Sequence, residues 1–224
     1  MPFAVLGCLL FLAVLFAPRW WVKRIGTMYS ADRPDYPGTG GDLARHLLDA
    51  CALDYVPVEF TDGADRYDPV KRVVQLARVN YYGRSLTAVA VAAFQVGHAI
   101  QHRDTEPAFM KSVDTAASID KTEKAAKLAL FMVPVVGIFT RSPVFALLTA
   151  ACFVLLRAYR VLYYLTTLPV ELDAAFNKAL PILSVGYLEP PDQRAARRVL
   201  KACAFSRVAA ACASLLNPAD VLRR

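Results

Sequence analysis

Four stretches of this chain carry almost no charge, and basic residues stand directly beside each of them. The uncharged stretches are 1–18, 128–140, 142–156 and 202–216, the last interrupted only by Arg207. Basic side chains cluster at 19–24, 121–127, 157–160 and 194–201. Apolar helices with such flanks are typical of membrane proteins, where the basic flanks lie on the cytoplasmic side. The pattern predicts an integral membrane protein with about three to four apolar helices.

Composition excludes several classes of protein. Of the 224 residues 56% are apolar and 20% are charged, whereas soluble domains usually have about 45–50% and about 25%. In so apolar a chain, the net charge of +7 favours helix flanks over a nucleic-acid-binding surface. The five cysteines have no CxxC spacing, which predicts neither a disulfide framework nor a zinc–thiolate site. We therefore expect the membrane, and no nucleic acid, as a partner.

The alternation of apolar and polar stretches predicts four parts. They are an N-terminal membrane anchor at 1–25, a polar domain at 26–124, an apolar helical hairpin at 125–165, and a segment at 166–224 with a final apolar helix. A pair of buried soluble helices is the alternative interpretation of the hairpin. The hairpin helices are short for a bilayer, so they would span only if side chains such as Arg157 extend toward the interface.

The first apolar stretch has its positive charge after it rather than before it. Arg19 follows the stretch, and Trp20 and Trp21 stand at the boundary. A cleaved signal peptide carries its charge first, and tryptophans favour the membrane interface. We therefore expect a retained anchor whose N-terminus lies outside the cell. The polar domain would then lie on the cytoplasmic side of a multi-pass protein.

The polar domain contains signals for helices and strands. Apolar spacing predicts a helix over 42–51 with Thr39 or Asp42 as its cap, and alternation predicts strands at 56–60 and 72–76. A run at 85–102 is apolar on nearly every face until Gln95. It predicts a buried helix with Ser85 as its N-cap.

The buried helix contains a near match to a zinc-protease motif. The motif H-E-x-x-H places two histidines on one helix face toward a metal, with a glutamate that takes a proton from the metal-bound water. Here Phe94 and Gln95 stand where the first histidine and the glutamate would be, and His98 stands at the second histidine. By itself this segment is not a motif.

The surrounding segments closely resemble the YugP-like family of neutral zinc metallopeptidases, small membrane proteins whose helix carries A-A-H-E-V-G-H-A-x-Q. The matching segments are Tyr67–Pro69, Asn80–Ser85, Ala90–Ala93, Val96–Gln101 and Leu168–Ala174, the last resembling the family's L-P-V-E-F-x-A. The resemblance extends over essentially the whole chain. It implies a zincin-like α+β fold, mainly α with a small β-sheet, in a bacterial inner membrane. By analogy with zincins, it also implies that Glu171 would be the third zinc ligand.

Both departures from the family motif remove chemistry. Phe94 has no atom that binds a metal, and catalytic zinc usually has three protein ligands. Gln95 cannot act as a base, a role typically worth about 10²- to 10⁴-fold in rate. The sequence therefore predicts a scaffold without peptidase activity, with zinc absent or weakly bound. Both a natural pseudoenzyme and an engineered inactive form would carry such changes, and Glu to Gln is a standard inactivating substitution.

The histidines and Glu171 also have simpler interpretations. His98 and His102 are four residues apart, so together with Glu171 or Glu106 they could hold a metal one turn further along the helix. Ala99 follows His98, so that shifted site would lack a base. Alternatively, His98 is a buried histidine bonded to a carbonyl or to Glu171, and His102 is a surface residue at the helix end. Glu171 would then be an acid in the first turn of a helix that begins near Pro169.

Three functions are compatible with these residues. The first is an inactive peptidase fold that binds a protein partner or segment, by strand addition at an edge formed by Val73–Leu76. The second is a zinc-dependent membrane endopeptidase whose motif is altered or inactivated in this chain. The third is a structural subunit of a membrane complex, because short apolar helices are often completed by neighbours.

Overall fold

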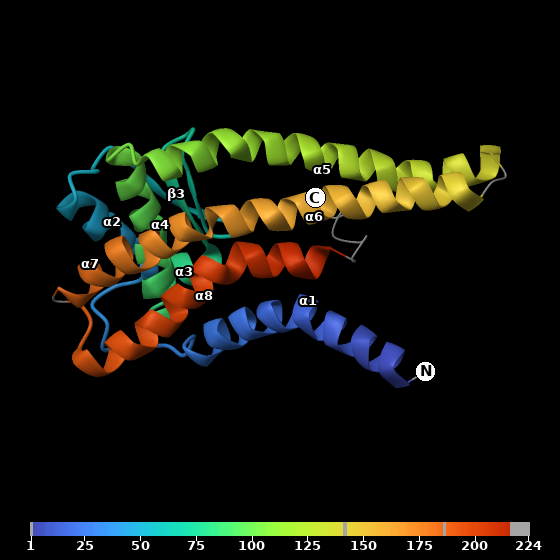
Figure 1. The fold of residues 1–224 in the computed structure, drawn as a ribbon. Helices are drawn as coiled ribbons and strands as arrows, with labels where there is room; N and C mark the ends of the chain where they lie inside the picture. Colours follow the sequence, from blue (N-terminus) through green and yellow to red (C-terminus); the bar gives the residue numbers. More distant parts are fainter. Residues whose placement is uncertain (1, 141–142, 186, 216–224) are drawn as a thin grey trace. The chain divides into compact units, whose positions relative to one another are not determined.

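The computed structural model describes residues 2–140, 143–185 and 187–215, and over them the chain is mainly helical with one small sheet (Figure 1). The helices are α1 (Pro2–Met28), α2 (Gly40–Ala50), α3 (Arg78–Tyr81), α4 (Leu86–Arg103), α5 (Pro107–Thr140), α6 (Pro143–Asp173), α7 (Leu180–Ser184) and α8 (Pro190–Ser214), with a π-helical turn η1 (Ala174–Ala179) after α6. The strands are β1 (Val58–Thr61), β2 (Arg66–Asp68) and β3 (Val73–Ala77). The predicted fold class, mainly α with a small sheet, is confirmed.

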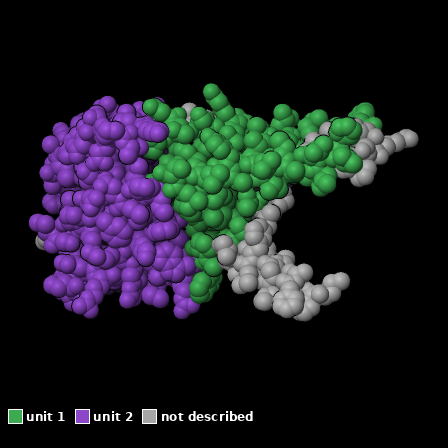
Figure 2. Space-filling view, viewed as in Figure 1, with its two compact units in different colours: residues 1–20, 112–167, 207–224 green, residues 21–111, 168–206 purple. Residues whose placement is uncertain are grey.

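The chain forms two compact units, each assembled from separate segments (Figure 2). Unit 1 contains residues 1–20, 112–167 and 207–224, and unit 2 contains residues 21–111 and 168–206. Unit 2 therefore holds the sheet, α4 and the segment around Glu171. Unit 1 holds most of the predicted hairpin.

The sheet has the order β1-β3-β2, with β1 parallel and β2 antiparallel to β3. The prediction that Val73–Leu76 forms an edge is wrong, because β3 pairs with a strand on both sides. The edges are β1 and β2. Strand β2 was not predicted because its three residues overlap the turn signal Asp68-Pro69 and are too few to show alternation.

Helix α4 forms the centre of unit 2, as the apolar run predicted. Its N-cap is Ser85, whose hydroxyl accepts a hydrogen bond from the Ala88 backbone N–H at 3.1 Å. Every residue from Leu86 to Gln101 is buried except Thr87. Gly97 lets η1 approach closely, since a Cβ atom there would lie 2.7 Å from the Ala174 carbonyl oxygen.

Helix α6 does not begin near Pro169 but passes through it and ends at Asp173. The interpretation of Glu171 as a first-turn acid is therefore wrong. The next six residues form the π-helical turn η1. Single π-turns within helices frequently occur at functional sites, and this one begins three residues after Glu171.

Unit 1 exposes a broad apolar surface along α5 and α6. Its exposed large apolar side chains include Leu128, Phe131, Ile138, Phe139, Val144, Leu147, Leu148, Leu155 and Leu162. Within the described ranges, one helical stretch, Ala150–Ser184, is long and apolar enough to cross a bilayer, and only 17% of its most apolar window is buried. These features agree with membrane association. The other predicted spans stay predictions, and the side chains of the N-terminal anchor before Leu15 lie outside the described part.

Two arginines of α6 are buried inside unit 1. Arg160 forms an ion pair with Glu123, and Arg157 donates to the Ser214 carbonyl oxygen at 2.6 Å. Both side chains are under 10% exposed. Buried charges need such partners because desolvation is costly.

Candidate functional site

The end of α6 brings Glu171 to His98 in the middle of unit 2. His98 Nε2 and Glu171 Oε2 are 3.2 Å apart, and both side chains are 4% exposed. The His98 ring lies between two phenylalanine rings: Phe94 meets it edge-on at 4.8 Å and Phe109 stacks at 5.9 Å between centroids. Two residues that are 73 positions apart in sequence thus form one buried polar pair within aromatic walls.

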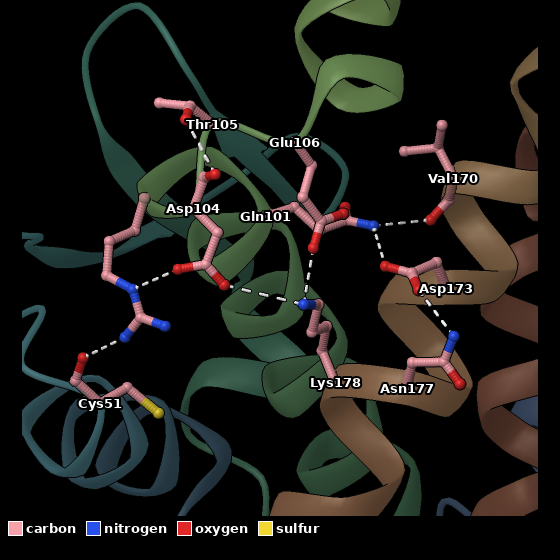
Figure 3. Close-up of polar contacts among 10 residues, drawn as sticks. Cys51, Gln101, Asp104, Thr105, Glu106, Val170, Asp173, Asn177 and Lys178 are labelled. Carbon is pink, nitrogen blue, oxygen red and sulfur yellow. Dashed lines mark hydrogen bonds and ion pairs between the residues drawn. The ribbon is translucent and has the colours of Figure 1, made fainter.

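Gln101 fixes the orientation of the His98 ring. Its amide nitrogen donates to the Val170 carbonyl oxygen at 3.0 Å and to Asp173 Oδ2 at 2.8 Å (Figure 3). The amide oxygen lies 3.0 Å from His98 Nδ1. The Val170 and Asp173 oxygens both need the amide nitrogen of Gln101 on their side, so its amide oxygen faces the His98 ring. His98 Nδ1 must then carry the hydrogen of this contact.

This arrangement directs the Nε2 electron pair of neutral His98 at Glu171. An electron pair and a carboxylate oxygen at 3.2 Å repel each other unless a proton or a cation lies between them. Metal-binding histidines typically have this form, with one ring nitrogen on the metal and the other donating to a protein acceptor. The pair has the orientation of two ligands of a metal site.

An outer layer of charges ties η1 to the end of α4 (Figure 3). Lys178 Nζ lies 2.6 Å from Glu106 Oε1 and 3.7 Å from Asp104 Oδ2. Asn177 donates to Asp173 Oδ1 at 2.7 Å. The carboxylate that holds Gln101 is therefore itself held from the π-helical turn.

His102 lies apart from this pair and contacts β2. Its Nδ1 is 2.8 Å from the Tyr67 hydroxyl. Burial lowers the pKa of His102, and the positive charge of Arg72 lowers it further. Burial also raises the pKa of Tyr67 to about 12, so burial favours the neutral form of both groups in this contact. Across the residues that the structure describes, no group of three or more His, Cys, Asp or Glu side chains is placed to hold a metal.

Helix α4 also borders a cavity of about 270 Å³, one turn before His98. Its lining residues come from α1, the loop before β2, α4 and α8: Val22, Gly26, Ala64, Asp65, Thr87, Val91, Phe94, Gln95, Val199, Ala202, Cys203 and Ser206. Gln95 is 5% exposed. Its amide oxygen has no hydrogen-bond partner among the described residues. The two positions that depart from the family motif therefore form part of a mostly apolar hollow.

A sequence profile of the family described as "Putative neutral zinc metallopeptidase" matches residues 4–223. The chain belongs to this family. A curated relative, "Putative membrane protease YugP" of Bacillus subtilis (strain 168), is 32% identical over 208 residues, which cover 92% of this chain and 89% of the relative. No solved structure matches the chain.

The zinc that the family name implies does not fit the residues present here. Of the ligands that the family resemblance implies, this chain offers two donors, His98 Nε2 and Glu171 Oε2. Phe94 puts a hydrocarbon ring beside them. A catalytic zinc site usually has three protein ligands and a water, so this neutral zinc metallopeptidase fold lacks one ligand. It also lacks a base, because the amide of Gln95 has no useful proton affinity.

The family resemblance assigns candidate ligand roles to His98 and Glu171, but it assigns no role to the neighbouring Gln101, Asp173 and Lys178. One signal was available, because Gln101 is three residues after His98 and therefore shares its helix face. No sequence signal connects Asp173 to Gln101, since 72 residues separate them.

Proposed function

We propose that this chain is a membrane-bound pseudopeptidase that binds a protein segment instead of cleaving it. The observation that carries this proposal is a difference between the end of the family motif, at His98, and its start, at Phe94 and Gln95. His98 and Glu171 lie 3.2 Å apart with a supporting network, while Phe94 and Gln95 provide neither a ligand nor a base. The fold is kept, and the parts that perform hydrolysis are missing.

The sheet offers a place for the bound segment. Extended segments bind to proteins by adding a strand to an open sheet edge. Strand β2 is an edge strand, and its Tyr67 contacts His102 at the end of α4. A segment paired with β2 would therefore run beside the helix that carries the family motif.

The apolar surface of unit 1 supports a membrane location. We propose that α5 and α6 form a hairpin within the bilayer and that unit 2 lies on the cytoplasmic side of a multi-pass bacterial inner-membrane protein. The exposed apolar residues of the hairpin support insertion. The basic clusters on its flanks support the orientation. A cysteine introduced at Asp62, an exposed loop position, should be modified by a membrane-impermeant maleimide in inverted vesicles and protected in intact cells. The reverse pattern would contradict the orientation.

A second candidate is a membrane endopeptidase whose motif has been altered or inactivated. The intact contact between His98 and Gln101 favours it, because the ring keeps the orientation that a zinc ligand needs. This candidate differs from the first in one measurable respect. It predicts that the rest of the peptidase machinery still works once the motif is restored.

Metal content tests the first proposal directly. Protein purified without added zinc should contain far less than one zinc per chain. The double variant Phe94→His with Gln95→Glu should contain close to one. Near-stoichiometric zinc in the unaltered chain, lost in His98→Ala, would overturn the pseudopeptidase proposal.

Activity of the double variant separates the two candidates. Cleavage of fluorescently labelled casein by the zinc-loaded double variant, but not by the unaltered chain, would support an altered peptidase. Zinc binding without cleavage would show that the groove serves binding alone. Phe94→His by itself is the matched control, because it restores a ligand without restoring the base.

A further inference from the structure

We infer that the cavity beside Phe94 and Gln95 binds one large apolar side chain of a protein segment, whose backbone N–H donates to the Gln95 amide oxygen. The inference rests on the proposed segment-binding function. It specifies what the segment must contain, which neither the family nor the fold specifies.

The size and walls of the cavity indicate an apolar group of limited size. Its volume is about 270 Å³, whereas drug-sized ligands occupy pockets of about 300–1,000 Å³. A cavity of about 150 Å³ with apolar walls already holds benzene. Val91, Val199 and Ala202 form much of the wall here. The space therefore suits one aromatic or long aliphatic side chain.

Gln95 indicates that the ligand carries a hydrogen-bond donor. Its side chain is 5% exposed and lines the cavity, and its Oε1 has no partner among the described residues. Buried amide oxygens are normally hydrogen-bonded, because leaving one unpaired is unfavourable. Two other polar side chains in the wall already have partners: Asp65 accepts from the Ala77 backbone N–H at 2.7 Å and from Asn80 at 2.9 Å, and the Thr87 hydroxyl donates to the Gly26 carbonyl oxygen at 2.9 Å.

The position of β2 favours a protein segment over a lipid chain. Asp65 lines the cavity and directly precedes β2. In the described residues, the outer edge of β2 pairs with no other strand. A backbone that follows this edge can place a side chain in the cavity and an N–H near Gln95. An acyl chain could fill the same apolar space but has no hydrogen to donate to the amide oxygen.

A displayed library of random twelve-residue peptides, selected on the protein in lipid nanodiscs, tests the inference. The selected peptides should share one large apolar residue, and replacing it with alanine in a synthetic copy should weaken binding at least ten-fold. Ala202→Leu, which fills the cavity, should weaken binding of the same peptide by a similar factor. Ala195→Leu is the matched control, because Ala195 lies on the same helix and does not line the cavity.

The donor is tested separately with an N-methylated peptide. Methylation of the N–H at the apolar residue should weaken binding to the unaltered chain. It should have no further effect on Gln95→Leu, because that variant has lost the acceptor. If methylation weakened binding to the unaltered chain and to Gln95→Leu by the same factor, the role of Gln95 as acceptor would be overturned.

The outcomes distinguish the inference from the proposed function. If peptides are selected but bind Ala202→Leu as tightly as the unaltered chain, the cavity assignment is wrong and segment binding stands. If no peptide is selected, segment binding itself is contradicted. If only radiolabelled palmitate binds, and Ala202→Leu abolishes its binding, the occupant is an acyl chain and the inference is overturned. Equal melting temperatures of the two leucine variants would exclude misfolding as the cause of a lost interaction.

Discussion

Two neighbouring turns of α4 differ in how completely their polar groups are paired. In the later turn, His98 and Gln101 contact each other, and Gln101 also binds Val170 and Asp173. In the turn before it, Gln95 is also buried, yet among the described residues its amide oxygen has no partner, and the space beside it is a cavity. Both turns lie within one eight-residue stretch of the helix.

This difference shows which parts of α4 depend on one another. Gln101 is bonded to three different groups, so each of them loses a partner if it changes. Phe94 and Gln95 border the cavity, where a change of side chain leaves few groups unpaired. A substitution at Gln95 would therefore leave the contact between His98 and Gln101 intact.

The sharpest test is the same substitution, glutamine to leucine, in the two turns. Gln101→Leu leaves His98 Nδ1, the Val170 carbonyl and Asp173 without their bonds, and unpaired buried groups cost about 1–3 kcal/mol each. We expect it to lower the free energy of unfolding by about 3–5 kcal/mol. Gln95→Leu should change that energy by less than about 1 kcal/mol, since it removes an amide oxygen that is already unpaired. Unfolding of both variants in mixed detergent micelles measures the difference, and equal losses would refute the comparison.

A smaller effect is expected where α4 meets η1. In Gly97→Ala the new methyl group would lie 2.7 Å from the Ala174 carbonyl oxygen, so the helices must separate. Overpacking of this kind typically costs about 1–3 kcal/mol. Gly26→Ala is the control, because no atom lies within 4 Å of its new methyl group and alanine favours a helix. Melting temperatures should fall for the first variant only, and a fall in both would point to a general intolerance of alanine.

The smallest effect concerns pH and the end of α4. Because the pKa of His102 is lower in the folded state, the unfolded chain binds more protons once the pH falls below about 6.5. The stabilisation is complete above that pH and is lost as the pH falls through the folded pKa. His102→Gln should flatten the decline in stability between pH 7.5 and 5.5. His46→Gln, at an exposed position of α2, should leave the decline unchanged, and an identical slope in His102→Gln would contradict the prediction.

Local sequence signals were sufficient for α2 and α4. The Ser85 cap and the apolar run predicted α4, and Thr39 was one of two predicted caps of α2; its hydroxyl accepts from the Asp42 backbone N–H. Local signals did not predict the secondary structure where it depends on partners far away in the sequence. The short β2 and the continuation of α6 through Pro169 were both missed, because pairing and packing in the folded chain override weak local preferences.

The sequence by itself determined which chemistry is absent. A phenyl ring at Phe94 and an amide at Gln95 bind no zinc and take no proton, whatever the fold around them. Only the tertiary structure decided what replaces that chemistry. It brings Glu171 to His98, directs a ring nitrogen through Gln101, and leaves a hollow beside Gln95. Each of these features joins elements from separate parts of the chain, so no local pattern of residues could encode its geometry.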